Sequence, residues 1–204
     1  TRAADVLTVA LPTYNTNLCL QSQTLDSWTS TTSSVTANSA AAPDGTTTAD
    51  YFIPDSGTTG RRYLPTATTA SATTYTASIY FNVATTPLDQ FTVFFGNTGE
   101  GGPDRSGVTV TVSGVTMANY SAGAGAAPSA KSIETLSGGW YRLIFTFAST
   151  TVSAASAIVV RYLGASADST KGVLAWGAQL ETGSTAGAYI PTTTVAVTAA
   201  PLNY

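Results

Sequence analysis

Residues 74–83 read TYTASIYFNV, and residues 140–147 read WYRLIFTF. In both stretches the large apolar side chains recur at every second position, which is the period of a β-strand and not that of a helix. One face of these two stretches carries Tyr75, Ala77, Ile79 and Phe81, and Tyr141, Leu143, Phe145 and Phe147. The pattern predicts two long strands that each pack one face into an apolar core.

Four shorter stretches repeat this alternation, at residues 91–95, 108–112, 158–163 and 173–181. In the last of them we expect the core face to be Leu174, Trp176, Ala178 and Leu180, and the opposite face to be Val173, Ala175, Gln179 and Glu181. Strong helix formers are scarce, and Gly, Pro, Asn and Asp separate the strands. The sequence therefore predicts an all-β fold, an antiparallel two-sheet β-sandwich of the jelly-roll type.

The two ends of the chain differ in composition from its middle. Residues 1–16 and 193–204 are rich in Thr, Ala, Val and Pro and nearly free of charge. We expect a jelly-roll body over residues 17–192, preceded by an N-terminal arm or inter-module linker and followed by a C-terminal arm. The arms are either frayed tails or strands added to a neighbouring subunit. Because the chain opens on Thr-Arg-Ala-Ala-Asp without Met, we expect a processed chain or a section of a longer one.

The composition of the 204 residues excludes several kinds of site. The chain has no His and a single Cys, Cys19, so it holds no Ser-His-Asp triad, no His-ligated metal and no internal disulfide. A net charge of −3 does not suit a nucleic-acid binder, and no apolar run reaches the length of about 18 residues that spans a membrane. Only 9% of residues are charged, against roughly 25% in an average soluble domain. So little charge suits a subunit of a permanent assembly, because little repulsion holds its copies apart.

The aromatic residues supply the first candidate binding site. Trp28, Trp140 and Trp176 could stack on sugar rings or pack within the protein, and we expect Trp28 and Trp176 to be packed. Trp140 lies beside Arg142 in the sequence, and if their strands are neighbours one face would gather the candidate glycan-binding residues Trp140, Arg142, Tyr80 and Arg161, together with Asn82. Such a face could bind a glycan by stacking and planar hydrogen bonds, or it could be an internal or subunit interface.

The eleven acidic residues form no motif of paired carboxylates. A glycosidase needs two carboxyl groups roughly 5 to 10 Å apart. Folding could bring together Asp50, Asp55, Glu134 and Glu181, yet nothing in their spacing requires it, and we expect no enzymatic activity. We expect no cofactor apart from a structural calcium ion. Its first candidate ligands are Asp44, Asp50 and Glu181, although acids of this kind serve equally as surface charges and turn caps.

One segment is more specific than composition or alternation. Residues 176–192, WGAQLETGSTAGAYIPT, closely resemble a segment near the C-terminal end of lectin-like jelly rolls, of concanavalin or carbohydrate-module type, in tailed-phage virion proteins. Weaker similarities to the same proteins occur at earlier positions, in the order in which those proteins have them, at residues 17–29, 42–50, 74–83 and 138–147. The resemblance covers most of residues 17–192 and implies a jelly-roll fold. It also implies a place on the virion surface, as a head decoration, a head fibre or a tail-fibre part, and some such folds bind glycans.

Composition and resemblance together give one main hypothesis and two rivals. The main hypothesis is a phage virion structural protein, exposed on the particle, whose partners are copies of itself and other virion proteins. The alternative is a carbohydrate-binding or receptor-binding module that recognises host or environmental glycans. A hydrolase or lyase acting on surface polysaccharide is the third, and it requires two carboxylates that converge in a cleft. We expect no nucleic-acid partner and no membrane insertion.

Overall fold

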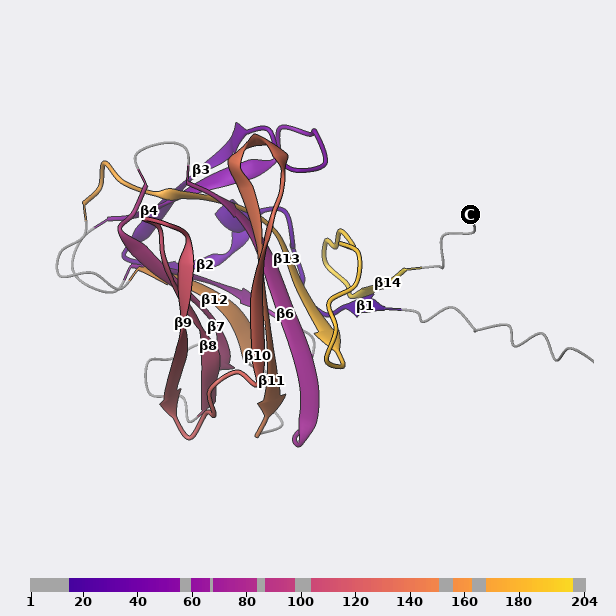
Figure 1. The fold of residues 1–204 in the computed structure, drawn as a ribbon. Coiled ribbons are helices and arrows are strands. Elements are labelled where there is room, and N and C mark those ends of the chain that lie inside the picture. The colour runs from indigo at the N-terminus through magenta and orange to yellow at the C-terminus, as the bar shows by residue number, and fades with distance from the viewer. Residues whose placement is uncertain are drawn as a thin grey trace, which may run out of the picture.

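The computed structural model describes residues 15–55, 60–66, 68–83, 87–97, 104–150, 156–162 and 168–199. Its strands form two six-stranded antiparallel sheets that stack face to face (Figure 1). Sheet I runs in the order β10 (Ala130–Thr135), β11 (Trp140–Ser149), β6 (Thr73–Asn82), β13 (Val173–Thr182), β4 (Ala49–Pro54) and β3 (Ser33–Ala40). Sheet II runs in the order β2 (Thr29–Thr31), β5 (Arg61–Pro65), β12 (Ser156–Tyr162), β7 (Gln90–Asn97), β8 (Asp104–Thr111) and β9 (Thr116–Gly123).

The predicted fold class, an all-β two-sheet sandwich, is confirmed. The chain crosses repeatedly between the sheets, since β4 of sheet I leads to β5 of sheet II and β6 of sheet I leads to β7 of sheet II. The helical segments of the described residues are the short 3-10 turns Leu25–Ser27 and Ser137–Gly139. Within these same ranges, no helix is long and apolar enough to cross a membrane.

The core lies between the two sheets and uses the faces that the alternation predicts. Sheet I contributes Tyr75, Ala77, Ile79, Phe81, Leu143, Phe145 and Phe147, all buried. Sheet II contributes Phe91, Val93, Phe95, Val108, Val110, Ile158, Val160 and Tyr162. Phe95 of sheet II stacks on Phe147 of sheet I, with ring centroids 4.7 Å apart. These large buried faces hold the two sheets in fixed positions relative to each other.

Strand β13 departs from strict alternation. Trp176 lies opposite Tyr80 of β6, but the next partners are Gln179 and Ser78, so one extra residue has entered β13. This β-bulge includes Gly177, whose φ is +65°. A bulge shifts every later side chain to the other face.

The prediction that Leu174 and Trp176 share the core with Ala178 and Leu180 is therefore wrong. Val173, Ala175, Ala178 and Leu180 face the core. Leu174 and Trp176 belong to a second apolar cluster on the outer face of sheet I.

The two ends of the described chain lie side by side (Figure 1). Strand β1 (Thr16–Asn17) pairs antiparallel with β14 (Val197–Thr198), and the hydroxyl oxygens of Thr16 and Thr198 are 2.7 Å apart. The backbone N–H of Gln21 also donates to the carbonyl of Thr193 at 2.6 Å. Residues 193–199, which we assigned to the C-terminal arm, thus bond at several positions to residues 15–21 of the same chain. Residues 1–14 and 200–204 lie outside the described residues.

Candidate functional site

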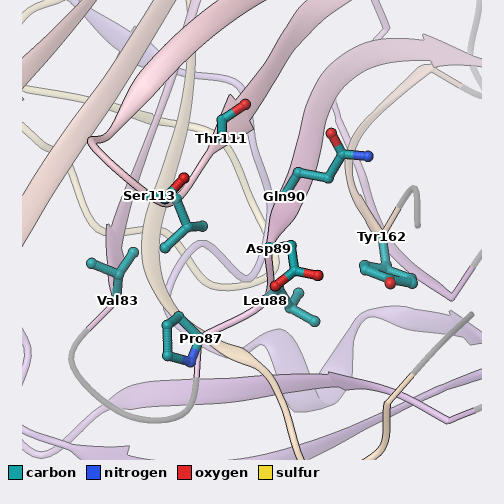
Figure 2. Close-up of a pocket in the computed structure, with 9 residues that line it drawn as sticks. Val83, Pro87, Leu88, Asp89, Gln90, Thr111, Ser113 and Tyr162 are labelled. Carbon is teal, nitrogen blue, oxygen red and sulfur yellow. The ribbon is translucent and has the colours of Figure 1, made fainter. Parts of the chain in front are cut away.

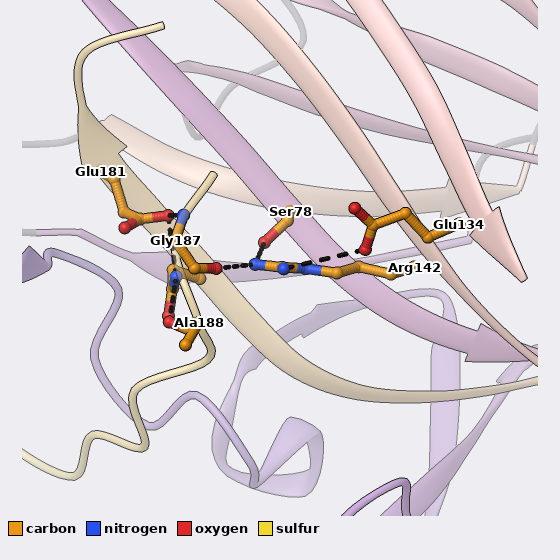
Figure 3. Close-up of polar contacts among 7 residues, drawn as sticks. Ser78, Glu134, Arg142, Glu181, Gly187 and Ala188 are labelled. Atoms are coloured by element: carbon orange, nitrogen blue, oxygen red, sulfur yellow. Dashed lines mark hydrogen bonds and ion pairs between the residues drawn. The ribbon is translucent and has the colours of Figure 1, made fainter. Parts of the chain in front are cut away.

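The outer face of sheet I is covered by residues 183–192, which we call the strap. The strap follows β13 directly and folds back over the sheet, held by side chains of β13 itself. Gln179 donates from Nε2 to the carbonyl of Ala188 at 3.1 Å, and its Oε1 accepts the N–H of Ile190 at 2.7 Å. Glu181 accepts the N–H of Gly187 at 2.9 Å through Oε2 (Figure 3). Two polar side chains of β13 thus supply the strap backbone with the hydrogen-bond partners that a neighbouring strand would otherwise supply.

Arg142 of β11 anchors the strap from the other side. Its Nη2 donates to the carbonyl of Gly187 at 2.7 Å and to Oγ of Ser78 at 3.1 Å (Figure 3). Its Nη1 lies 3.9 Å from a carboxylate oxygen of Glu134, and its guanidinium carbon lies 5.3 Å from the centre of the Tyr80 ring. Arg142 is only 7% exposed. The guanidinium is therefore engaged by the protein itself, and it joins β11, β6 and the strap.

The aromatic residues beside Arg142 are also packed. The register places Trp140 opposite Asn82 and Arg142 opposite Tyr80, so these residues do share one face. Trp140 and Tyr80 are buried in the second apolar cluster together with Leu174 and Trp176. Tyr189 of the strap closes this cluster, because its ring lies 4.5 Å from that of Trp176 and 5.9 Å from that of Tyr80. The rings therefore present no open face on which a sugar could stack.

Burial has an electrostatic consequence for the two tyrosines of this cluster. Loss of water around the hydroxyl raises the pKa of Tyr80 and, more strongly, that of Tyr189. The hydroxyl of Tyr189 shares a hydrogen bond of 2.6 Å with Oγ of Ser22, which opposes part of this rise in pKa. Both hydroxyls stay neutral at physiological pH and serve packing.

Arg161 does not belong to this face, and its grouping with Trp140, Arg142 and Tyr80 is wrong. It lies on β12 in sheet II, the opposite layer of the sandwich. There its guanidinium carbon lies 5.0 Å from the centre of the Phe94 ring and 5.1 Å from that of Tyr120. Its Nη2 donates to the Tyr120 hydroxyl at 2.7 Å. Alternation assigns residues to faces of a strand but does not say which sheet the strand joins.

The three calcium candidates lie in separate places with separate roles. Asp44 accepts the N–H and the hydroxyl of Thr46, at 2.9 and 2.6 Å, which closes a turn. Asp50 is buried and accepts the N–H of Asn38 at 2.8 Å; burial raises the pKa of Asp50 while this hydrogen bond acts to lower it. Glu181 holds the strap. Across the described ranges, no three acidic or Cys side chains come close enough together to hold a metal ion.

A groove of about 350 Å³ runs between the strap and strands β10 and β11. The polar side chains that line it include Lys131, Ser132, Glu134, Thr146 and Ser184. Lys131 is bound through Nζ to Oδ1 of Asn119 at 2.5 Å. The groove offers no aromatic ring, so it lacks the stacking surface that sugar sites commonly use.

A larger cavity lies at one end of the sandwich, and we call it the end pocket. It has a volume of about 670 Å³ and is lined by Val83, Pro87, Leu88, Asp89, Gln90, Thr111, Val112, Ser113 and Tyr162. Figure 2 shows Val83 and Pro87 on one side of it and Gln90 and Tyr162 on the other. Leu88, Val112 and Tyr162 are nearly buried, and Asp89 is exposed. The Nζ atom of Lys171 lies 3.4 Å from Oδ1 of Asp89.

No pattern in the sequence predicts the end pocket. Its residues come from the ends of β6, β7, β8 and β12 and from the loops beside them. These segments are far apart in the sequence, and none carries a motif that marks a binding site.

Comparison with known proteins adds information on the fold. No family model matches the chain, and no curated protein sequence does. Solved structures do match. One contains the CBM22-1 and GH10 modules of endo-1,4-β-D-xylanase 10B from Clostridium thermocellum, complexed with xylohexaose; it is 12% identical, with a TM-score of 0.50 over 87% of this chain and 30% of that one. Another is an arabinose-bound GH51 α-L-arabinofuranosidase, 14% identical, with a TM-score of 0.50 over 81% of this chain and 26% of that one.

The chain spans less than a third of the length of each of these two proteins. At this level of identity the likeness concerns the fold alone. The fold is a β-sandwich similar to parts of these two structures.

Proposed function

We propose that this chain is a carbohydrate-binding β-sandwich module and that it binds a glycan in the end pocket. The observation that supports the proposal is the composition of that pocket, in which apolar and polar groups meet in about 670 Å³. Pockets for small ligands commonly have volumes of about 300–1,000 Å³ and combine an apolar lining with a few polar groups. The structural neighbours, one complexed with xylohexaose and one with arabinose, make a sugar the first ligand to test.

The lining matches the two needs of a sugar. A pyranose or furanose ring has apolar C–H groups, for which the partly exposed side chains of Val83 and Pro87 provide contact. Its hydroxyls need directional partners, and the carboxylate of Asp89 and the hydroxyl of Ser113 stand at the rim of the pocket. Because the positive charge of Lys171 lies beside Asp89, the rim carries little net charge. This favours a neutral glycan over an anionic one. The module in this proposal binds a glycan without cleaving it.

The test is calorimetric titration with neutral xylo-, arabino- and gluco-oligosaccharides. Wild-type protein should bind at least one of them, and Asp89→Ala should weaken binding by about tenfold or more, equal to a loss of about 1.4 kcal/mol. Asp44→Ala removes another exposed acid, remote from the pocket residues, and should bind as wild type does. Unchanged affinity in Asp89→Ala, or no binding of any glycan by correctly folded wild type, would reject the proposal.

A second candidate function is a structural subunit on the surface of a tailed-phage virion. It is favoured by the resemblance of residues 176–192 and by a chain of which only 9% is charged. The partners would then be copies of the chain and other virion proteins. Deleting residues 1–14 or 200–204 tests the arms without disturbing the β1–β14 pair. Each truncated chain should fold normally but assemble poorly. Normal assembly of both truncated chains would contradict the role of the arms.

A further inference from the structure

The four outer strands of the two sheets differ in how they are protected. Sheet I ends in β10 and β3, and sheet II ends in β2 and β9. An outer strand exposes unpaired backbone N–H and C=O groups, which can pair with a strand of another molecule. Proteins commonly prevent this with short strands, charged side chains or bulges.

Three of these strands show such protection. β2 has only three residues. β10 carries the charges of Lys131 and Glu134 within six residues. β3 loses its regular register between Thr36 and Ala40, and Asn38 within this irregularity has a φ of +51°.

Strand β9 shows none of these features. Its eight residues read TMANYSAG, with neither a charged side chain nor a proline. It pairs with β8 through eight successive positions, from Thr116 opposite Thr111 to Gly123 opposite Asp104, without a register shift. Five of its eight residues are exposed. Outside this pairing, the described contacts of β9 are made by its two faces and its end: Met117 packs against the core, Lys131 of β10 donates to Asn119, Tyr120 contacts Phe94 and Arg161, and the N–H of Gly125 bonds to the carbonyl of Ala122.

We propose that β9 pairs antiparallel with β9 of a second copy of this chain, which joins the two copies of sheet II into one continuous sheet. A second copy fits because an antiparallel pair of identical strands has twofold symmetry, and each strand then offers the other the same set of groups. The strand carries no charge, so like charges do not oppose each other across the pair. The net charge of −3 adds little long-range repulsion between copies. This inference is independent of glycan binding.

The experiment measures the mass of the protein in solution by light scattering over a concentration series. Wild type should be a dimer that dissociates on dilution. Ala118→Lys changes an exposed residue of β9 and puts a positive charge on both strands of the symmetric pair, so it should weaken dimerisation by about tenfold or more. Ser34→Lys makes the same change of charge at an exposed position of β3 and should dimerise as wild type does.

Amide hydrogen exchange gives a second measurement that does not depend on the variants. The amides of β9 should be protected at high protein concentration and should lose this protection on dilution, while those of β3 should not change. A wild-type protein that stays monomeric at its solubility limit would overturn the proposal. So would an Ala118→Lys protein, with a wild-type circular dichroism spectrum, that dimerises as strongly as wild type.

Discussion

Gln179 in β13 accepts the N–H of Ile190, eleven residues later in the chain, at 2.7 Å. The same amide donates to the carbonyl of Ala188 and to a carboxylate oxygen of Glu181, at 3.1 and 2.8 Å. The Gln179 side chain thus makes the backbone hydrogen bonds that an adjacent strand would make, and it holds the strap against the sheet. In the segment Trp-Gly-Ala-Gln-Leu-Glu, the Gln and the Glu hold the strap, the Gly forms the bulge and the Trp packs beneath the strap. The residues that carry the resemblance are accounted for by folding.

Replacing Gln179 by Glu should destabilise the protein with almost no change in shape. A carboxylate can still accept from Ile190, but it cannot donate to Ala188 and it would face Glu181. We expect a loss of about 3 kcal/mol in the free energy of unfolding, because the buried carboxylate of Glu181 and the partly buried carbonyl of Ala188 lose their donor. Urea unfolding of Gln179→Glu measures this loss of stability. Gln23→Glu makes the same change at a partly exposed site and serves as the control. Equal stability of the two variants would show that Gln179 does not hold the strap.

Replacing Gly177 by Ala should be more harmful than the same change at Gly45. Both glycines have positive φ, +65° and +85°, which costs an alanine roughly 1 kcal/mol or more. A Cβ at Gly177 would also lie 2.9 Å from Cδ2 of Tyr80, whereas a Cβ at Gly45 would meet no atom within 4 Å. The difference between the two variants in thermal unfolding therefore isolates the close contact. If both lose the same stability, Tyr80 moves aside freely and the close contact adds nothing to the cost of the positive φ.

The bulge also shows where reasoning from the sequence stops. Alternation identified the core faces of β6 and β11 correctly, because those strands are regular. It failed in β13, where one extra residue at Gly177 reverses the faces. It could not place Arg161, because a period of two carries no information on strand order. The end pocket could not be predicted from the sequence, because its lining residues come from separate segments that meet only in the folded chain.

Replacing Arg142 by Lys should loosen the strap while keeping the positive charge. A lysine has no planar fork, so it cannot bond to Ser78 and Gly187 in the geometry seen here. We expect the amides of residues 184–190 to exchange faster with solvent, and the stability to fall by about 1–3 kcal/mol. Lys131→Arg is the matched control, at an exposed position of β10. Unchanged exchange in the strap of Arg142→Lys would show that the backbone alone keeps it closed.

Tyr189 should make the protein less stable at alkaline pH. Burial raises the pKa of its hydroxyl in the folded state above the ordinary value of 10.0. Above pH 10 the unfolded chain therefore releases a proton that the folded chain retains, so stability falls as pH rises, by about 1.4 kcal/mol per pH unit for one such group. Tyr189→Phe removes the titrating hydroxyl, and its free energy of unfolding should decline less steeply than that of wild type between pH 10 and 11.

The control for this prediction is Ser22→Ala, which removes the partner of the Tyr189 hydroxyl but keeps the hydroxyl itself. Both variants lose the hydrogen bond between Ser22 and Tyr189, and Ser22→Ala also removes the acceptor of the Thr192 N–H. At pH 7 Tyr189→Phe should therefore be less stable than wild type by about 1 kcal/mol, and Ser22→Ala by more than that. They should then separate above pH 10, because Ser22→Ala keeps the steep decline and Tyr189→Phe does not. Parallel pH profiles of the two variants would mean that Tyr189 ionises as readily in the folded protein as in the unfolded chain, and that the strap leaves its hydroxyl open to water.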